Sequence, residues 1–531
     1  MALALPTYET DQLVSMIGSK RPLVGQLRVL LAPLMARKGP TRFLDPFCGS
    51  GAVSRLARGM GMQVMASDLE PFSFILNHVY LTLRSDDLVP MFTEMGGIDA
   101  YLSMLNLHGL FAAETGGGMT EPYLSRHYAP QETENPDLLG ERLFFTAENA
   151  RFLDAVREEI EHSWEERRIS ATEKTVVLAS ILYEASRRAN TSGTFTAYHK
   201  DLLGSRSRIM QRCQLQAPLL PDEEVAQGEM HLCDAATFVK SRSADICFLD
   251  PPASVHQYGS AYHLLNSIAV WDRYAPSGCR DGEGRLSDRA GIRSDWKSTY
   301  SPFCSLKHAD AAFIHLFGAI DARHIVLTYP ASSLVSSERI VELLRARHDP
   351  VTVIPLQKRN QGGRQAKDGK QQIEQVFITG KSDAFSVPVG SGVDRLPLIR
   401  RLDALASAVF ARPMEVPPFS FLGNVMLENS LPVETLLQMP LETLARRIGE
   451  LERSVCSSGE QALHVLLSQA ANMDLTAPVR AKLVKRSVSL VRSMAREVGV
   501  GRLKEIVMTC TAPQKVLEVM DAIAYHATQE E

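Results

Sequence analysis

The sequence predicts an α/β fold: a Rossmann-like, doubly wound sheet with a helical insert, followed by a helical C-terminal domain. Two observations support this prediction. Between residues 41 and 68 a short strand, a glycine-rich turn, a helix and a second strand that ends on an acid follow one another. Another buried-strand pattern, 244–249, returns only after a long run of helical patterns, and it too ends on an acid, Asp250. One sheet interrupted by an insert explains both.

The first part of the sheet is predicted in detail. Apolar positions at helical spacing over 24–37 lead to a basic pair and a glycine, which is a usual C-terminal signature of a helix. The strand 41–45 runs directly into the turn 46–51, Pro-Phe-Cys-Gly-Ser-Gly, and an apolar helix pattern follows at once. The next strand, 63–68, ends on an acid. This order of elements opens a doubly wound sheet.

Beyond residue 84 the chain is predicted to alternate between insert, sheet and a separate domain. Residues 1–84 and 231–384 are expected to form the two parts of the α/β domain, with the helical insert, 85–230, between them. A boundary that contains proline and glycine, 385–396, then leads to the helical C-terminal domain, 397–531. Helices are expected at 72–84, 146–168 and 170–190, and further strands at 324–329, 350–356 and 375–379.

The composition is that of a soluble globular protein of more than one domain, with 531 residues of which 45% are hydrophobic and 22% charged. The net charge of −4 argues neither for nor against nucleic acid, so a nucleic-acid surface would have to be a local patch. The eight cysteines show no paired spacing typical of zinc sites, and no secretory signal or membrane-length apolar run is seen. We therefore expect a cytoplasmic protein with reduced thiols and no metal.

Two stretches are locally basic. The first runs from Arg187, at the end of the predicted helix 170–190, to Arg212, and the second lies in a glycine-interrupted stretch near 358–370. A solvated face explains either run, taken alone, about as well as a nucleic-acid contact does.

The glycine-rich turn 46–51 is the first feature that carries chemistry. Its glycines allow a tight turn and let a ligand approach the main chain closely. Asp68, at the end of the next strand, is placed to accept hydrogen bonds from a ribose diol. The same pattern would suit a dinucleotide, and some such turns bind nothing.

The second feature is Asp250-Pro251-Pro252 at the end of a buried strand. The two prolines stop the strand at the carboxyl edge of the sheet, where α/β proteins bind ligands. Asp250 and a prolyl carbonyl could accept both hydrogens of an amine. The exocyclic N6 amine of adenine is a poor nucleophile because its lone pair is delocalised into the ring, and fixing both N–H bonds favours a more tetrahedral nitrogen. The alternative is a strand terminator with a capping aspartate.

These elements occur in an order that resembles a known family. Ser15-Met16-Ile17-Gly18-Ser19-Lys20, the glycine loop, the ribose acid, a helical insert and Asp-Pro-Pro resemble the D12 class of adenine-specific DNA methyltransferases over about residues 12–380. Within the insert, 188–195 is similar to the family's Arg-x-Asn-x-x-Gly-x-Phe element, which contacts DNA. The resemblance implies a Rossmann-like sheet that depends on S-adenosyl-L-methionine, and N6 methylation of adenine in duplex DNA after base flipping.

The resemblance also implies roles for particular residues. Met16 and Lys20 would line the methionine and target-base side, Asp45 and the glycine loop would hold the methionine moiety, and Asp234 would meet the adenine amine of the cofactor. The implied cofactor-binding residues are Met16, Lys20, Asp45, Phe47, Gly49, Ser50, Gly51, Asp68 and Asp234, and the implied catalytic residues are Asp250, Pro251, Pro252 and Ala253. The implied DNA-binding residues are Arg187, Arg188, Asn190, Phe195, Tyr198, Lys200, Arg206, Arg208, Lys358, Arg359 and Arg364.

The chain departs from the family at Ala253, where the family has an aromatic ring that stacks on the flipped base. Stacking of this kind is worth roughly 1–3 kcal/mol per base, so its loss should weaken or abolish activity. No nearby aromatic obviously replaces this ring, although Tyr258 or Tyr262 could move into its place. A natural loss of activity and a deliberate weakening substitution both explain Ala253, and the intact surroundings favour the second. An aromatic also stands in much of the family where this chain has Met16.

The family implies a role in bacterial restriction-modification or anti-phage defence, and the C-terminal domain suggests a partner subunit. Two rival interpretations remain. One is an RNA or protein amine methyltransferase with the same pocket, although Asp250 rather than asparagine before the prolines argues against the protein-glutamine type. The other is a catalytically silent, DNA-binding regulatory subunit, which Ala253 would explain.

Overall fold

The computed structural model describes residues 7–36, 38–202, 207–221, 225–331, 333–347, 350–358 and 372–380, and helical residues between 442 and 521. The chain divides into two compact units, one of Met1–Tyr329, Ser333–Thr352 and Val376–Ser386, and one of Pro330–Ser332, Val353–Gln375 and Val387–Glu531. Within these described ranges, no helix is both long and apolar enough to cross a bilayer.

A seven-stranded sheet organises the α/β part. Its strands are β1 (Arg42–Asp45), β2 (Gln63–Asp68), β3 (Glu229–Leu232), β4 (Ser243–Leu249), β5 (Asp321–Pro330), β6 (Val351–Lys358) and β7 (Gln372–Thr379), in the order β3-β2-β1-β4-β5-β7-β6. The pairs β3–β2, β2–β1, β1–β4 and β4–β5 are parallel. Gly380, which follows β7, donates its N–H to the carbonyl of Pro350, which precedes β6, so the sheet ends in an antiparallel pair. The predicted fold class is confirmed.

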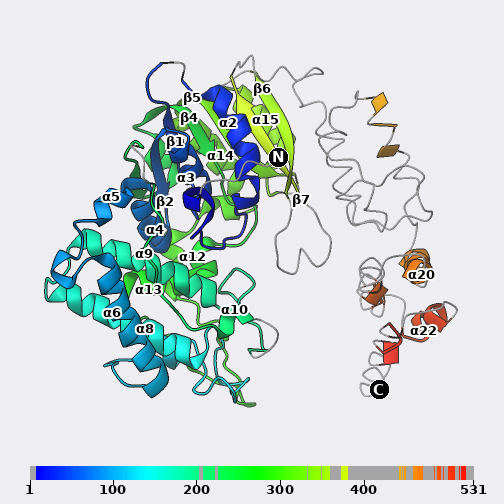
Figure 1. Ribbon diagram of the computed structural model, residues 1–531. Coiled ribbons are helices and arrows are strands. Elements are labelled where there is room, and N and C mark those ends of the chain that lie inside the picture. Colours follow the sequence, from blue (N-terminus) through cyan, green and yellow to red (C-terminus); the bar gives the residue numbers. More distant parts are fainter. Residues whose placement is uncertain are drawn as a thin grey trace. The chain divides into compact units, whose positions relative to one another are not determined.

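Helices cover both faces of this sheet (Figure 1). One group consists of α2 (Val24–Leu31), α3 (Ala52–Gly59) and α4 (Pro71–Thr82), and the other of α11 (Ala235–Val239), α14 (Ala309–Ala319) and α15 (Ser337–Arg345). The crossovers from β1 to β2 and from β4 to β5 run in opposite directions along the sheet. Because such crossovers are right-handed, the two groups lie on opposite faces.

The insert is a helical layer that lies beside the sheet, below it in Figure 1. Its main helices are α6 (Ile98–Thr115), α8 (Ala147–Glu165) and α9 (Ala171–Arg188), with short helices α5 (Ser85–Leu88), α7 (Leu124–His127) and α10 (Ser207–Met210). Ser170 and Glu173 form a capping box that starts α9, and Thr146 caps α8.

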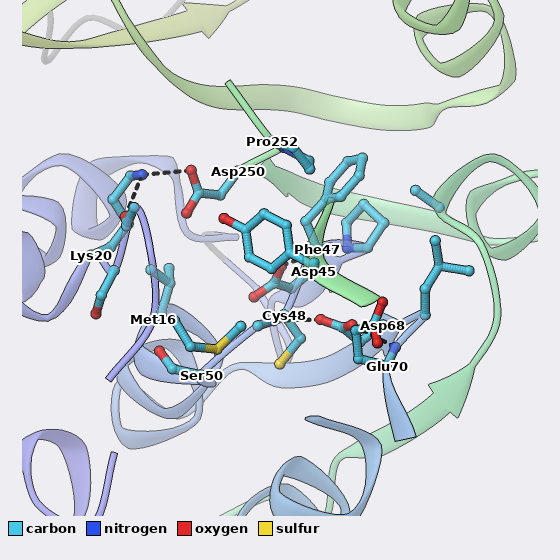
Figure 2. A pocket seen from close by; sticks show the side chains of 18 of the residues that line it. Met16, Lys20, Asp45, Phe47, Cys48, Ser50, Asp68, Glu70, Asp250 and Pro252 are labelled. Atoms are coloured by element: carbon cyan, nitrogen blue, oxygen red, sulfur yellow. Dashed lines mark hydrogen bonds and ion pairs between the residues drawn. The ribbon is translucent and has the colours of Figure 1, made fainter. Parts of the chain in front are cut away.

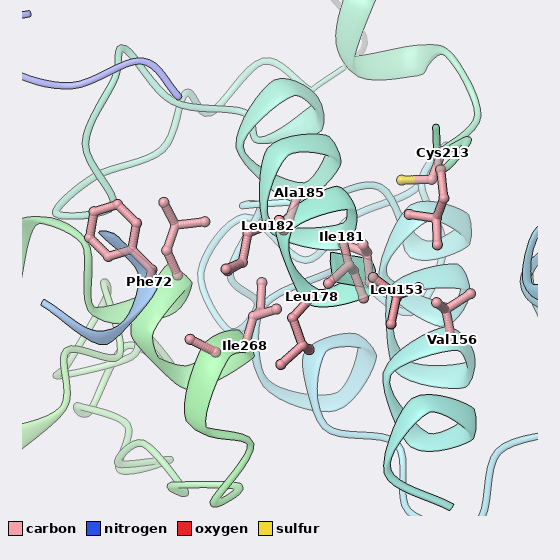
Figure 3. Packing of buried hydrophobic residues seen from close by; sticks show 14 of the residues in the cluster. Phe72, Leu153, Val156, Leu178, Ile181, Leu182, Ala185, Cys213 and Ile268 are labelled. Atoms are coloured by element: carbon pink, nitrogen blue, oxygen red, sulfur yellow. The ribbon is translucent and has the colours of Figure 1, made fainter. Parts of the chain in front are cut away.

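One hydrophobic core joins the insert to the sheet domain. Figure 3 shows Leu178 and Leu182 of α9 between Leu153 of α8 and Ile268 of α13 (His263–Val270). Phe72 of α4 belongs to the same cluster, and all five side chains are buried. The insert therefore packs as part of the first unit and holds α13, which comes shortly after the end of β4.

The long helix α6 was not predicted as a separate element. Gly116 ends it in the left-handed conformation (φ +71°), so the glycine run 116–118 is its C-terminal cap. Apolar residues occur on more than one face of α6: one side is buried against α8, and Leu107 and Phe111 are exposed on another. A single apolar stripe is therefore missing from the pattern.

The second unit contains the helices α20 (Gly459–Ala470) and α22 (Val500–Met508). They pack around a core that includes Leu463, Leu467, Leu503 and Ile506. The predicted boundary at 385–396 lies outside the described residues.

Candidate active site

A cleft that is open to solvent lies at the carboxyl ends of β1, β2 and β4. Four segments line most of it: 16–20, 45–53, 68–70 and 248–252. The direct pairing of β1 with both β2 and β4 places the glycine-rich turn, Asp68 and Asp250 at one edge of the sheet, although they are far apart in sequence. Parallel strands end at the same edge, so this meeting follows from the strand order.

The conformation of the glycine-rich turn is fixed by hydrogen bonds to side chains of neighbouring segments. The Gly49 N–H donates to Oδ2 of Asp68 (2.8 Å), and the Gly49 carbonyl accepts from Ser73 Oγ (2.7 Å) and Asn77 Nδ2 (2.9 Å). Gly51 has φ +79°, and a Cβ there would lie 1.9 Å from Oδ1 of Asn77. Only glycine fits this position without a shift.

Two acids at the ends of β1 and β2 line the cleft (Figure 2). Asp45 accepts hydrogen bonds from Ser54 Oγ (2.6 Å) and the Phe47 N–H (3.3 Å), and burial raises its pKa to about 7. Asp68 accepts from the N–H groups of Gly49 and Glu70, and burial raises its pKa also. A carboxylate has about four acceptor positions, so each can still bind a donor or cation in the cleft.

A third acid, Glu70, was missed by the sequence reasoning. Its side chain is buried, lines the cleft and accepts a hydrogen bond from Asn266 Nδ2 of α13 (2.5 Å). Burial raises the pKa of Glu70 to about 7. The available signal was its position two residues after Asp68, but nothing in the sequence shows that α13 reaches it.

Lys20 and Asp250 form an ion pair at the other end of the cleft, away from Asp68 and Glu70 in Figure 2. Lys20 Nζ lies 2.6 Å from Oδ1 of Asp250 and 3.0 Å from the carbonyl of Gly18. The Lys20 side chain is 4% exposed, whereas that of Asp250 is 25% exposed. The carboxylate therefore remains accessible from the cleft.

Two tyrosines hold the turn that carries Lys20. The Tyr262 hydroxyl accepts a hydrogen bond from the Ile17 N–H (2.6 Å), and the Tyr258 hydroxyl donates to the Ile17 carbonyl (3.0 Å). Tyr258 begins α12 (Tyr258–Ala261), and both residues follow the Asp-Pro-Pro segment closely. Tyr262 is fully buried, but Tyr258 lines the cleft. Of the two, Tyr258 is the ring that a bound molecule can meet.

The structure brings most of the expected cofactor and catalytic residues into this cleft. Those lining it are Met16, Lys20, Asp45, Phe47, Gly49, Ser50, Asp68, Asp250 and Pro252. Gly51 shapes the turn from behind, Pro251 is buried and Ala253 is half-buried beside the cleft. Asp234 caps α11 by accepting from the Thr237 N–H (3.0 Å), and its neighbour Ala235 is the lining residue there.

The residues expected to bind DNA separate into two groups. Arg188, Asn190 and Phe195 are buried. Arg188 donates to Glu184 and Gln211, and Asn190 donates to the carbonyls of Leu143 and His199. A direct contact with DNA would require these side chains to leave their partners, so we assign them to holding the 189–199 loop.

Arg187, in the last turn of α9, is partly exposed, as is Tyr198 in the loop; Lys200 follows the loop directly. Tyr198 donates to the Glu141 carbonyl (3.2 Å), and Lys200 is exposed. The remaining candidates, Arg206, Arg359 and Arg364 and the side chains of Arg208 and Lys358, lie outside the described residues.

Comparison with known proteins identifies the family. Residues 16–279 match the model of the D12 class N6 adenine-specific DNA methyltransferases. The type II methyltransferase M.NlaIII of Neisseria lactamica is 28% identical over 337 residues, covering 62% of this chain and 86% of that protein. The type II methyltransferase M.FokI of Planomicrobium okeanokoites is 27% identical over 380 residues, covering 71% of this chain and 54% of that protein.

The modification methylase LlaI of Lactococcus lactis subsp. lactis is 26% identical over 310 residues, or 57% of this chain and 44% of that protein. The chain thus spans about half the length of two of these relatives. Through residues 16–279, the chain belongs to the D12 class of DNA methyltransferases.

Proposed function

We propose that this D12-class chain transfers a methyl group from S-adenosyl-L-methionine to the N6 amine of adenine in duplex DNA. The observation that supports this most is the shared cleft. Asp250, which can receive the target amine, lies in the same cavity as the buried Asp45 and the partly buried Asp68, two acids that suit a cationic nucleoside. Both partners of the reaction can therefore meet at the carboxyl edge of one sheet.

The cofactor end of the cleft fits S-adenosyl-L-methionine in its donor set. Asp68 retains acceptor positions for the two ribose hydroxyls, and Asp45 offers a negative charge to the cationic methionine portion. The glycine turn lets that portion approach the main chain. When bound, the cofactor supplies a methyl group activated by its sulfonium.

The target end orients the amine. Asp250 and the carbonyl of Pro251 are proposed to accept the two N–H bonds of N6, so that its lone pair faces the methyl group. A new N–C bond forms as the C–S bond breaks, and the excess proton on N6 is released to Asp250 or to solvent. A paired adenine cannot reach the cleft, so the base must leave the stack first.

DNA binding is proposed for the exposed part of the insert. Arg187, which also lies 3.7 Å from Glu184, and Lys200 offer positive charge in the same insert as Tyr198, which suits phosphate contacts near an extruded base. The type II methyltransferases to which the chain is similar suggest a restriction-modification context. We also propose that residues 397–531 bind a further subunit of a defence system.

Ala253 favours a second candidate function. It provides no ring for the flipped base, and the nearby ring in the cleft, Tyr258, is engaged with Ile17. We propose that turnover is weak for this reason. A chain that binds DNA and cofactor without turnover would act as a silent regulatory subunit.

Methyl transfer from labelled S-adenosyl-L-methionine to mixed-sequence duplex DNA tests these functions. The chain is compared with Ala253→Tyr, and Asp250→Ala is the negative control. Restored stacking is worth roughly 1–3 kcal/mol, so Ala253→Tyr should yield about tenfold to hundredfold more N6-methyladenine. Product absent from both the chain and Ala253→Tyr, with cofactor binding retained, would support the silent subunit. Methylated RNA or protein in place of DNA would contradict the proposed substrate.

A further inference from the structure

Thr328 lies next to Asp250 in the centre of the sheet. β4 and β5 pair in parallel with Leu249 opposite Leu327, so the next residue on each strand, Asp250 and Thr328, fall side by side. Thr328 is fully buried and lies beyond the residues that the family model matches. A buried hydroxyl requires a partner, and here the partner is at the proposed reaction centre.

The hydrogen bonds of Asp250 are distributed unevenly between its two oxygens. Thr328 Oγ1 lies 3.0 Å from Oδ1 of Asp250 and 3.3 Å from the carbonyl of Leu249. Lys20 Nζ also binds Oδ1, at 2.6 Å. Among the residues that the structure describes, no donor to Oδ2 is seen. One oxygen is thus held by two donors and the other faces the cleft.

We infer that Thr328 is a positioning residue that, together with Lys20, fixes Oδ1 of Asp250 and reserves Oδ2 for the target amine. The inference deepens the proposed function and rests on it. Rotation of a carboxylate about its last torsion is soft, so the single contact with Lys20 Nζ does not by itself set the plane of the group. A second donor on a rigid strand does. Reaction rate depends on that orientation, whereas binding of cofactor and DNA does not.

The chain offers a clean set of substitutions. Thr328→Val keeps the shape and removes the hydroxyl, and Thr328→Ser keeps the hydroxyl and removes a methyl group. Thr379→Val is the matched control, because Thr379 is also a fully buried threonine of the sheet whose Oγ1 binds a main-chain group, the Ile325 N–H. It lies on β7 and is not a cleft residue in the described structure.

Single-turnover methyl transfer is measured in the chain and in its Ala253→Tyr form, with cofactor affinity, DNA affinity and thermal unfolding. Loss of a hydrogen bond to a charged group predicts that Thr328→Val lowers the transfer rate about tenfold to hundredfold. Affinities should stay within about twofold, as expected of an interaction that acts on orientation. Thr328→Ser should stay within about threefold, and Thr379→Val should leave the rate unchanged.

An unchanged rate in Thr328→Val, or an equal loss in Thr328→Ser, would overturn the inference, because either shows that the hydroxyl is not what matters. If no form transfers methyl groups, the proposed function fails, and crystal structures of the two Thr328 variants then decide the positioning role. Rotation of the Asp250 carboxylate in the valine variant alone supports it. An unmoved carboxylate in both refutes it.

Discussion

The cleft and the insert each carry a polar sequence motif, but the two motifs have opposite surroundings. In the cleft, Asp250 is 25% exposed and reaches the cavity. In the insert, Asn190 is 0% exposed and its amide binds two main-chain carbonyls of the protein itself. Polar residues at a strand end are presented to a ligand, whereas polar residues in a loop packed on helices satisfy the backbone.

The comparison shows how two kinds of motif should be interpreted. A motif can be specific to a family because it touches the substrate or because it builds the surface that does. Asp45 and Asp68 are of the first kind in our proposal, and Asn190 is of the second. Substitutions separate the two, since one kind changes binding and the other changes folding.

The largest effect is expected for Asn190→Ala. The buried carbonyl of Leu143 and the partly buried carbonyl of His199 lose their donor, and each unsatisfied group costs about 1–3 kcal/mol, so we expect a loss of about 2–6 kcal/mol in stability. Calorimetry should show the first unfolding transition lowered by several degrees, with cofactor affinity unchanged in the folded protein. Thr196→Ala, at an exposed position of the same loop, is the control and should change little. Normal stability together with lost DNA binding would instead make Asn190 a contact residue.

A smaller effect, about tenfold, is expected on cofactor binding as the pH changes. Burial raises the pKa of Asp45 from 3.8 to about 7. Such a carboxyl stabilises the ligand-free fold below its unfolded pKa, and this contribution is lost as the pH rises through about 7. A cationic ligand prefers the ionised form, so the affinity for S-adenosyl-L-methionine should rise about tenfold between pH 6 and pH 8.

Asp45→Asn is the matched variant for this measurement by isothermal titration. It should bind about tenfold more weakly at pH 8 and converge with the native chain at pH 6, because the native carboxyl is mostly protonated there. The ligand-free variant should also unfold at the same or a higher temperature at pH 8. A pH dependence that persists in Asp45→Asn would assign the effect to another group, with Glu70 as the first candidate.

The smallest effect is expected at the surface of the insert. Arg187→Ala and Lys200→Ala should each weaken DNA binding about threefold and reduce the slope of log affinity against log salt by about 1, because each would remove one of the proposed phosphate contacts. Fluorescence anisotropy at several salt concentrations measures both. Arg84→Ala, at a partly exposed residue outside the insert loop, is the comparison. Identical slopes for all three would remove this surface from the proposal.

The sheet and its cleft could be predicted because their signals are local. The strand that ends at Asp68 and the one that ends at Asp250 are short apolar runs closed by an acid, and the glycine turn fixes the path of the chain after β1. Once the strand order of a doubly wound sheet is assumed, these acids must meet. The order of the motifs in the D12 class then predicted most of the residues that line the cleft.

The remaining features depend on packing that no short pattern encodes. Glu70 enters the site because α13 places Asn266 beside it, and Thr328 does so through the register of β4 with β5. The burial of Arg188 follows from Glu184 one turn earlier and from Gln211, 23 positions later. A basic run in the sequence does not distinguish such an internal ion pair from a surface patch.

The adjacency of β1 and β4 bears on how such proteins diversify. Because these strands pair directly, the glycine turn and the Asp-Pro-Pro segment stay together whatever length of chain separates them. An insertion, deletion or exchange within the insert, between α4 and β3, alters the helical layer and leaves the two ends of the cleft in place. If the proposed function holds, evolution can vary which DNA is recognised while inheriting the chemistry unchanged, and recombination points within the insert preserve that chemistry.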